Sequence, residues 1–175
     1  MPVTLLTDRL VLRPWTDDDV DAAFDIYSRW EVARYLGATP QAWIDRSDAE
    51  AALARWSALT GEVHGVWAIV PKGEDLPVGS ALMKLLPASG TGEPTADTEV
   101  GWHLHPRAWG HGYATEAGGR LVENAWAHGL TEVYAVTYPQ NLASQAVCER
   151  LGMTRLGPTD RYYDTECELF VKRRD

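Results

Sequence analysis

The chain has 175 residues, of which 45% are apolar and 23% are charged, as in an ordinary globular domain. Its 16 basic and 25 acidic side chains give a formal net charge of −9, which repels polyanions and argues against nucleic acid as a partner. Two cysteines provide neither a disulfide framework nor a paired metal-ligand spacing, and no apolar run is long enough to cross a membrane. We therefore expect one domain over residues 1–175, located in the cytoplasm and without a membrane anchor.

The first third of the chain predicts one strand and two helices. Residues 5–13 alternate loosely between apolar and polar positions and end at a proline, which is typical of a strand. Thr16 is a suitable N-cap for the helix that follows, and a second helix is expected from Pro40 to about Leu59. The aromatic-rich connection at 30–36 either lines a pocket or packs between the two helices.

A hairpin and a further strand are expected in the middle of the chain. Residues 64–70 and 78–86 are rich in strand formers and are separated by the polar turn 71–75. Residues 88–97 are rich in Gly, Pro, Thr and Ser, which predicts an exposed loop, and residues 98–104 again favour a strand.

The segment after that strand has the pattern of a phosphate-binding turn. Gly110 and Gly112 precede a stretch whose apolar residues recur at helical spacing. Glycines let a ligand approach the backbone closely, and the unpaired amides at the start of a helix attract an anion. The lysine of a P-loop is missing, and Thr115 replaces the third glycine of a dinucleotide fingerprint. The apolar stripe of the predicted helix comprises Ala114, Ala117, Gly118, Leu121, Val122, Ala125 and Trp126.

The last part of the chain predicts three strands and one helix. A strand is expected at 132–138, a helix from near Asn141 to Leu151, and two further strands at 154–161 and 163–172. The predicted order is β, α, α, β, β, β, α, β, α, β, β. This order favours a mixed α/β fold with about seven strands and about four helices.

Three segments in this order also match one known family. The first is Thr-Asp-Arg-Leu-Val-Leu-Arg-Pro at 7–14. The second is Glu-Val-Gly-Trp at 99–102, followed by Trp-Gly-His-Gly-Tyr-Ala-Thr-Glu-Ala at 109–117. The third is Asn-Leu-Ala-Ser at 141–144, followed by Glu-Arg-Leu-Gly-Met at 149–153. With these motifs the chain resembles the GNAT N-acetyltransferases over nearly its whole length, and particularly the RimJ/RimL-type branch of ribosomal-protein-alanine N-acetyltransferases.

The resemblance implies a mostly antiparallel sheet that is splayed between its fourth and fifth strands, with acetyl-CoA in the gap and no metal. The pantetheine arm would bond to the backbone of the fourth strand, and the pyrophosphate would rest on the amides that open the central helix. The family's Q/R-x-x-G-x-G/A pattern maps onto Trp109, Gly112 and Ala114, so its first residue departs from the rule. The implied cofactor-binding residues are His103, Leu104, Trp109, Gly110, His111, Gly112, Tyr113, Ala114, Thr115, Asn141 and Ser144.

The implied reaction moves an acetyl group to a primary amine by direct attack in a ternary complex. Glu99 is the candidate base, directly or through water, and its alternative role is a solvated acid at a strand end. Cys148 stands where many members carry the tyrosine that protonates the thiolate. The resemblance implies Ser144 as the candidate donor instead, because it matches a serine of the alanine-acetylating branch. Cys148 itself is expected to be a small buried residue. Asn141 suits both an N-cap that bonds the amide of Ser144 and a contact to the pantetheine.

Alternatives remain open from the sequence alone. A member that has lost turnover would be an acyl-CoA sensor or an interaction module. His103, His105 and Glu99 on one strand face would also suit zinc, whereas the acidic triplet 17–19 is explained by the positive end of a helix. The acceptor is expected to be a small-molecule or peptide amine, and the negative net charge favours a cationic one. We expect a monomer or a homodimer.

Overall fold

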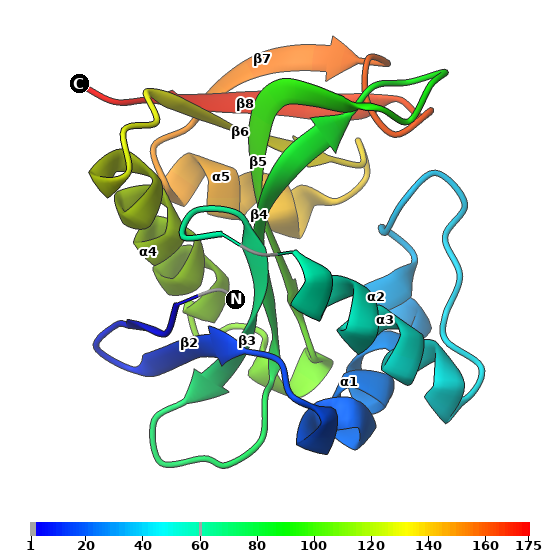
Figure 1. The fold of residues 1–175 in the computed structure, drawn as a ribbon. Helices are drawn as coiled ribbons and strands as arrows, with labels where there is room; N and C mark the ends of the chain where they lie inside the picture. The colour runs from blue at the N-terminus through cyan, green and yellow to red at the C-terminus, as the bar shows by residue number, and fades with distance from the viewer. Residues whose placement is uncertain (1–2, 60) are drawn as a thin grey trace.

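The computed structural model describes residues 3–59 and 61–175, and within these ranges the strands form one open sheet of eight (Figure 1). The strand order is β1-β2-β3-β4-β5-β6-β8-β7. Every neighbouring pair is antiparallel except β5 and β6, which run parallel. The predicted mixed α/β class and the mostly antiparallel sheet are therefore confirmed. The strands are β1 (Leu5–Leu6), β2 (Leu10–Pro14), β3 (Gly65–Pro71), β4 (Gly79–Pro87), β5 (Pro94–Leu104), β6 (Glu132–Thr137), β7 (Thr154–Thr159) and β8 (Cys167–Arg173).

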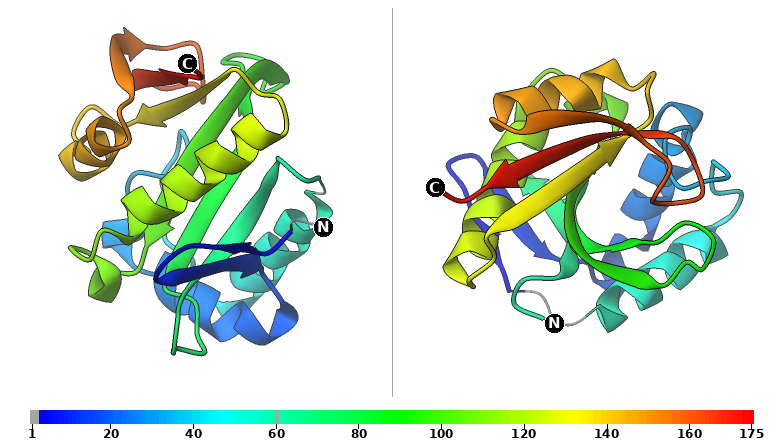
Figure 2. Two further views of the ribbon diagram at one scale, coloured as in Figure 1. Left: turned by 90° about the vertical axis from the view of Figure 1, so that its left-hand side faces the viewer. Right: turned by 90° about the horizontal axis from the view of Figure 1, so that it is seen from above.

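Helices cover both faces of the sheet, as the turned views in Figure 2 show. On one face α4 packs on the inner strands, and Trp67 and Ile69 of β3 share a buried cluster with Leu121. On the other face α1 and α3 pack on the alternate β3 residues Val66 and Ala68. Because β3 is buried on both sides, it consists of an unbroken apolar run. The helices are α1 (Val20–Tyr27), α2 (Trp30–Ala33), α3 (Arg46–Ala58), α4 (Tyr113–Ala127) and α5 (Leu142–Arg150).

The sheet divides where β5 meets β6. Strands β4 and β5 are paired from Gly79–Leu104 to Pro87–Pro94, whereas β5 and β6 pair at a single position, Glu99 with Tyr134. Beyond that position the two strands diverge, which confirms the predicted splay between the fourth and fifth strands of the sequence. The sheet is thus a β1–β5 half and a β6–β8–β7 half, joined at one point.

Two predictions for the first third of the chain are wrong in detail. Residues 5–13 form a hairpin, because the Thr7 hydroxyl accepts a hydrogen bond from the Leu10 amide (2.9 Å) and closes a turn. The second helix begins at Arg46, not at Pro40, because the Asp45 side chain caps it by accepting from the Ser47 amide (2.9 Å). The aromatic-rich connection contains α2.

Two strand boundaries also differ from the sequence prediction. The segment predicted as a loop at 88–97 already belongs to β5 from Pro94 onward. The last strand begins at Cys167, four residues later than predicted, because Tyr163 and Asp164 adopt left-handed backbone conformations (φ 59° and 51°). Because of the extra hairpin strand and α2, the described ranges contain one strand and one helix more than predicted.

Candidate active site

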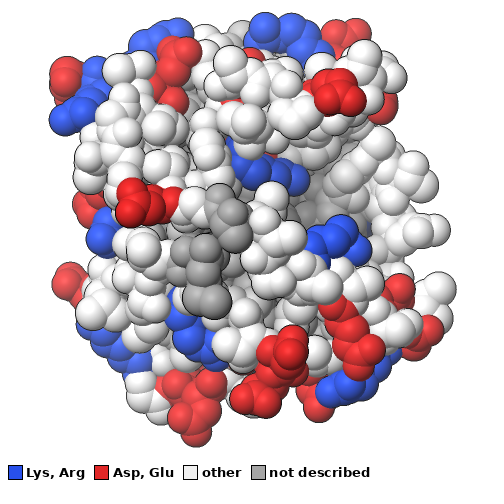
Figure 3. All heavy atoms as spheres, viewed as in Figure 1, with Lys and Arg blue, Asp and Glu red and all other residues white. Residues whose placement is uncertain are grey.

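A cleft of about 1090 Å³ opens where β5 and β6 diverge. Its walls come from β5, the turn before α4, the start of α5 and the segment that includes α2. In the face shown in Figure 3, basic side chains border a hollow, while acidic side chains gather below it. Of the residues predicted from the sequence, those that line the cleft are Glu99, His103, Leu104, Trp109, Gly110, Gly112, Tyr113, Ala114, Thr115, Asn141 and Ser144.

The turn before α4 presents unpaired backbone amides to the cleft. Gly110 and Gly112 both have φ of +77°, a conformation that glycine adopts without strain. A Cβ atom at Gly112 would also lie 3.3 Å from Nη2 of Arg9. The first backbone bond of α4 runs from the Glu116 amide to the Gly112 carbonyl (3.1 Å), so the preceding amides are available to an anion.

Thr115 supplies a direct test of whether this turn suits the pyrophosphate of acetyl-CoA. Its Oγ1 is buried and lacks a hydrogen-bond partner among residues 3–59 and 61–175. A buried hydroxyl without a partner costs free energy unless a ligand or water satisfies it. The free hydroxyl, the unpaired amides and the side-chain-free glycines together fit an oxygen-rich anion.

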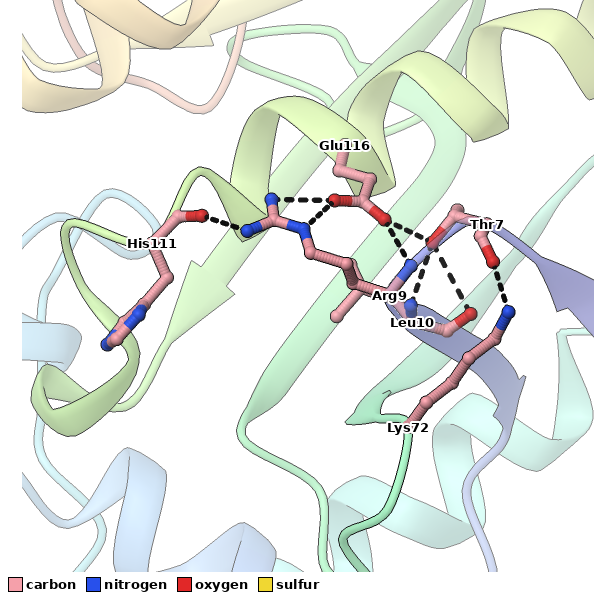
Figure 4. A network of polar contacts seen from close by, with 6 residues as sticks. All are labelled: Thr7, Arg9, Leu10, Lys72, His111 and Glu116. Atoms are coloured by element: carbon pink, nitrogen blue, oxygen red, sulfur yellow. Dashed lines mark hydrogen bonds and ion pairs between the residues drawn. The ribbon is translucent and has the colours of Figure 1, made fainter.

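The turn is held by a network that we call the Arg9 brace, made of Thr7, Arg9, His111 and Glu116 (Figure 4). The Glu116 carboxylate accepts from the Thr7 hydroxyl (2.6 Å), the Arg9 amide (2.8 Å) and Nε of Arg9 (2.7 Å). From the same guanidinium, Nη1 donates to the His111 carbonyl (2.8 Å). Burial would raise the pKa of Glu116, but these hydrogen bonds outweigh burial and lower it. The brace thus ties the β1–β2 turn to the middle of the glycine turn and to the first turn of α4.

His111 is the one predicted cofactor residue that does not line the cleft. Its carbonyl is bound to Arg9, and its ring stacks on Tyr113 with centroids 5.3 Å apart. The Arg9 guanidinium also lies 5.1 Å from the centre of the Tyr113 ring. His111 therefore helps to hold the turn in place.

Glu99 lies at the single point where β5 and β6 still pair, and it is 8% exposed. Its carboxylate accepts a short hydrogen bond from the Tyr163 hydroxyl. Burial raises the pKa of Glu99, although the nearby Lys84 ammonium and the Tyr163 hydrogen bond act in the opposite direction. A carboxylate with a raised pKa accepts a proton more readily than an ordinary one, which suits it to act as a general base.

Sequence analysis missed Tyr163. Its position depends on contacts between two loops, because Asp164 accepts from the Gly90 amide (2.6 Å) and donates its own amide to the Ser89 hydroxyl (3.0 Å). Left-handed backbone at non-glycine residues is costly and often marks functional sites. The only local signal was the run Arg-Tyr-Tyr-Asp at 161–164, which resembles the start of a strand.

His103 is a further titratable group that borders the cleft, and it is half-buried. Its Nδ1 lies 3.0 Å from the Tyr27 hydroxyl, which donates to the Ser80 hydroxyl (2.7 Å). Burial, with a smaller effect of Lys84, lowers the pKa of His103 to about 4, so the imidazole is neutral near pH 7. Next to it, the Leu104 carbonyl accepts from the indole of Trp109 (2.9 Å). That bond fixes Trp109 against the end of β5.

At the start of α5 the predicted cap is present, since the Asn141 side chain accepts from the Ser144 amide (3.3 Å). The Ser144 Oγ accepts from the indole nitrogen of Trp102 (3.1 Å), so its own hydroxyl hydrogen remains available to the cleft. Cys148, one turn further, is fully buried, and burial raises its pKa to about 12. Cys148 is therefore a packed thiol and is unsuited to act as a nucleophile.

His103 and His105, two of the three possible zinc ligands, contact different partners. His103 faces Tyr27, whereas Nε2 of His105 lies 3.1 Å from the Asp25 carboxylate and its Nδ1 accepts from the Arg107 amide (3.0 Å). Across the described ranges, no group of three or more His, Cys, Asp or Glu side chains is arranged to hold a metal ion. None of the helices described combines the length and apolarity needed to cross a membrane.

The sequence model of the acetyltransferase (GNAT) domain matches residues 9–154, which is most of the chain. The chain therefore belongs to the GNAT family, and it is an N-acetyltransferase. The resemblance found in the sequence motifs is confirmed.

Individual relatives are distant but extend over the full chain. An uncharacterized N-acetyltransferase of Bacillus subtilis (strain 168), YoaA, is 29% identical over 180 residues and covers 98% of both chains. RimL, a ribosomal L7/L12 α-N-protein acetyltransferase solved with coenzyme A, is 14% identical, with a TM-score of 0.79 over 99% of each chain. The microcin C7 self-immunity acetyltransferase MccE, solved with acetyl-CoA and AMP, is 14% identical, with a TM-score of 0.75 over 96% of this chain and 94% of that one. At these identities the likeness to RimL and MccE shows a shared fold.

Proposed function

We propose that this protein is an acetyl-CoA-dependent enzyme that acetylates a primary amine, on a small molecule or a protein N-terminus, by direct attack in a ternary complex. The observation that carries the proposal is the cleft between β5 and β6, with unpaired amides at one end and a buried carboxylate in its wall. The neighbours RimL and MccE, whose structures hold coenzyme A and acetyl-CoA, support the choice of cofactor.

The proposed cofactor contacts follow the cleft from the glycine turn to α5. The amides from Gly110 to Thr115 and the Thr115 hydroxyl take the pyrophosphate. The backbone of His103 and Leu104 and the side chain of Asn141 hold the pantetheine. The indole of Trp109, fixed by the Leu104 carbonyl, forms part of the wall at this end.

When bound, acetyl-CoA supplies an activated thioester carbonyl. Glu99 accepts, directly or through a water, the proton that the substrate ammonium must lose before its nitrogen can attack. Ser144 donates its hydroxyl hydrogen to the sulfur as negative charge develops there. The nitrogen–carbon bond forms and the carbon–sulfur bond breaks. The second proton that the nitrogen loses after the attack restores the Ser144 hydroxyl, and the first proton passes from Glu99 to solvent, so the products are an N-acetyl amine, a free thiol and one released proton.

A binding module without turnover is the second candidate, because Cys148 stands where many members of the family carry the tyrosine that protonates the thiolate. Such a sensor would bind acetyl-CoA at the same glycine turn. It would release no thiol beyond background hydrolysis.

A thermal melt with excess acetyl-CoA, followed by thiol release with a panel of amines, tests the proposal. Ligand at about 100 times Kd adds roughly 2.7 kcal/mol of stability, which raises the midpoint by several degrees for a chain of this size. A shift together with amine-dependent thiol release supports the enzyme, and a shift without thiol release supports the sensor. An unchanged midpoint in a protein that melts cooperatively contradicts both.

We also propose a cytoplasmic location, because Cys148 and Cys167 are both free and buried, as in proteins of a reducing compartment. A monomer or a homodimer remains our prediction for the oligomeric state. Size-exclusion chromatography with light scattering checks it, and a larger assembly would contradict it.

A further inference from the structure

Lys84 is a half-buried cation in the wall of the cleft, directly opposite Glu99 on the neighbouring strand. Its Nζ lies 5.1 Å from the centre of the Tyr163 ring, the same tyrosine that donates to Glu99. Among the residues that the structure describes, no carboxylate forms an ion pair with Lys84. A cation in this position has an aromatic face on one side and open cleft on the other.

The other two lysines of the chain are engaged differently. Lys72 donates to the Thr7 carbonyl (2.6 Å), and Lys172 donates to the Leu151 carbonyl (2.7 Å). Both tie parts of the backbone together, which is a structural role. Lys84 has no such bond within the described part of the chain, so the fold does not account for its charge.

A second cation lines the same cleft. Arg34, just after α2, is exposed, lines the cleft and lies over the Tyr35 ring at 4.6 Å. Like Lys84, it forms no ion pair with the carboxylates of residues 3–59 and 61–175. The cleft therefore carries cations that form no ion pair within the described residues, although the chain as a whole has a net charge of −9.

We propose that Lys84 binds an anionic group of the acceptor, so that the preferred acceptor is an amine with a carboxylate close to it, as in a free α-amino acid. Residues directly opposite on antiparallel strands hold their Cβ atoms about 4.5–5.5 Å apart. Lys84 and Glu99 can therefore meet the carboxylate and the ammonium of one small zwitterion. This inference rests on the proposed function, and Arg34 adds a second positive charge to the same cleft.

A purely electrostatic role for Lys84 makes a different prediction. The Lys84 charge also favours the ionised form of Glu99, and through Glu99 it would affect every acceptor alike. Binding of a carboxylate, in contrast, affects only acceptors that carry one. The two roles are separated by comparing each acid with its own uncharged amide.

The experiment measures kcat/KM for thiol release with the twenty α-amino acids, the carboxamides of those accepted, polyamines and a tripeptide. The wild-type enzyme is expected to prefer an acid over its amide by about tenfold or more, because a charge-assisted contact is lost. Lys84→Met should reduce kcat/KM for the acid by about tenfold and for the amide by less than about twofold. Lys84→Arg should retain most of the activity toward the acid.

Arg55→Met is the matched control, because it also removes one positive charge but lies on α3 outside the cleft. It should leave kcat/KM for the acid and for the amide unchanged. Should Lys84→Met fail to fold, inhibition of the wild-type enzyme by the carboxylate 4-methylpentanoate tests the inference instead. This anion should compete with the acceptor and not with acetyl-CoA.

Equal losses for acid and amide in Lys84→Met, or a wild-type preference for amides, polyamines or the tripeptide, would overturn the inference while leaving the acetyltransferase intact. Failure of the proposed function looks different, because no amine of any class would then release thiol. With a folded wild-type enzyme, absence of competition by 4-methylpentanoate also counts against Lys84 as a carboxylate site.

Discussion

The two ends of the cleft differ in how the protein satisfies its own polar groups. At the glycine turn, the Arg9 brace pairs Glu116 with a guanidinium, a hydroxyl and an amide, and so holds the turn in one shape. At the opposite end, where β5 and β6 still pair, Lys84 carries a charge without an ion pair among the described residues, next to a carboxylate with a raised pKa. A rigid end suits a cofactor that is the same in every turnover. An end with unpaired charges suits the acceptor, which the enzyme must distinguish from other amines.

Replacing Glu99 should cause the largest effect on turnover. Glu99→Gln removes the proposed proton acceptor, and general-base catalysis contributes about 10²–10⁴-fold, so kcat should fall within that range while acetyl-CoA affinity is retained. Because burial raises the pKa of Glu99, the wild-type rate should rise with pH above the ordinary carboxyl range, and the variant should lack this limb.

Glu93→Gln is the control for charge, since Glu93 lies outside the cleft and precedes β5. It should behave as the wild type. A Glu99→Gln enzyme that keeps the wild-type rate and pH profile would remove Glu99 from the mechanism.

Replacing Gly112 should break the cofactor end. Gly112→Val puts a β-branched residue at φ +77°, which costs about 1–2 kcal/mol, and sets its Cβ against the Arg9 guanidinium. With loss of the phosphate contacts, acetyl-CoA affinity should fall by about a hundredfold, since each 1.4 kcal/mol is tenfold. Isothermal titration calorimetry measures the dissociation constant of acetyl-CoA.

Gly73→Val tests whether backbone strain alone has this effect. Gly73 also has a positive φ (+90°), but it has open space around it and lies outside the cleft. It should lower stability and leave acetyl-CoA affinity unchanged. Equal affinities for both valine variants and the wild type would contradict the proposed phosphate site.

Replacing Ser144 should separate turnover from binding. Ser144→Ala removes the proposed donor to the thiolate and should lower kcat by about tenfold, the value of one hydrogen bond to a developing charge. The dissociation constant of acetyl-CoA should change by less than about threefold. The same pair of measurements on Ser57→Ala, an exposed serine of α3, should give wild-type values, and an unaltered kcat in Ser144→Ala would exclude the donor role.

The smallest effect is expected from loosening the Arg9 brace. Glu116→Gln should weaken acetyl-CoA binding by about three- to tenfold, because the turn keeps its glycines but loses its ion pair. The folded-state pKa of Glu116 is lowered, so the stability it contributes is present above the ordinary carboxyl range. That contribution is lost as pH falls through the lowered folded-state value.

Melting curves should therefore differ between wild type and Glu116→Gln at pH 7 and converge as the pH falls. Glu123→Gln, on the same helix and 74% exposed at its side chain, should match the wild type at every pH. A gap between the Glu116→Gln and wild-type curves that widens on acidification would contradict the assigned role of the carboxylate.

The two ends also differ in how well the sequence predicts them. The glycine turn and α4 were predicted because local signals agree: glycines before a helix, an apolar stripe and a matching family motif. The start of α3 was predicted at Pro40, whereas the capping contacts of Asp45 begin the helix at Arg46.

Contacts between distant residues were beyond prediction. Arg9 and Glu116 are 107 positions apart, and each alone resembles an ordinary surface charge. Tyr163 reaches Glu99 only because the loop at 160–164 is tied to residues 88–92, and no local pattern indicates a left-handed tyrosine. The family motif thus indicated the proposed cofactor end, and the proposed acceptor end required the structure.

Initial rates measured while both acetyl-CoA and a primary amine are varied test the central claim, that the two ends of one cleft work together in a ternary complex. Because Cys148 is buried with a raised pKa and no step passes through the protein, double-reciprocal plots should intersect. Parallel lines, which mean that an acetyl group is carried on the protein between two half-reactions, would contradict direct transfer.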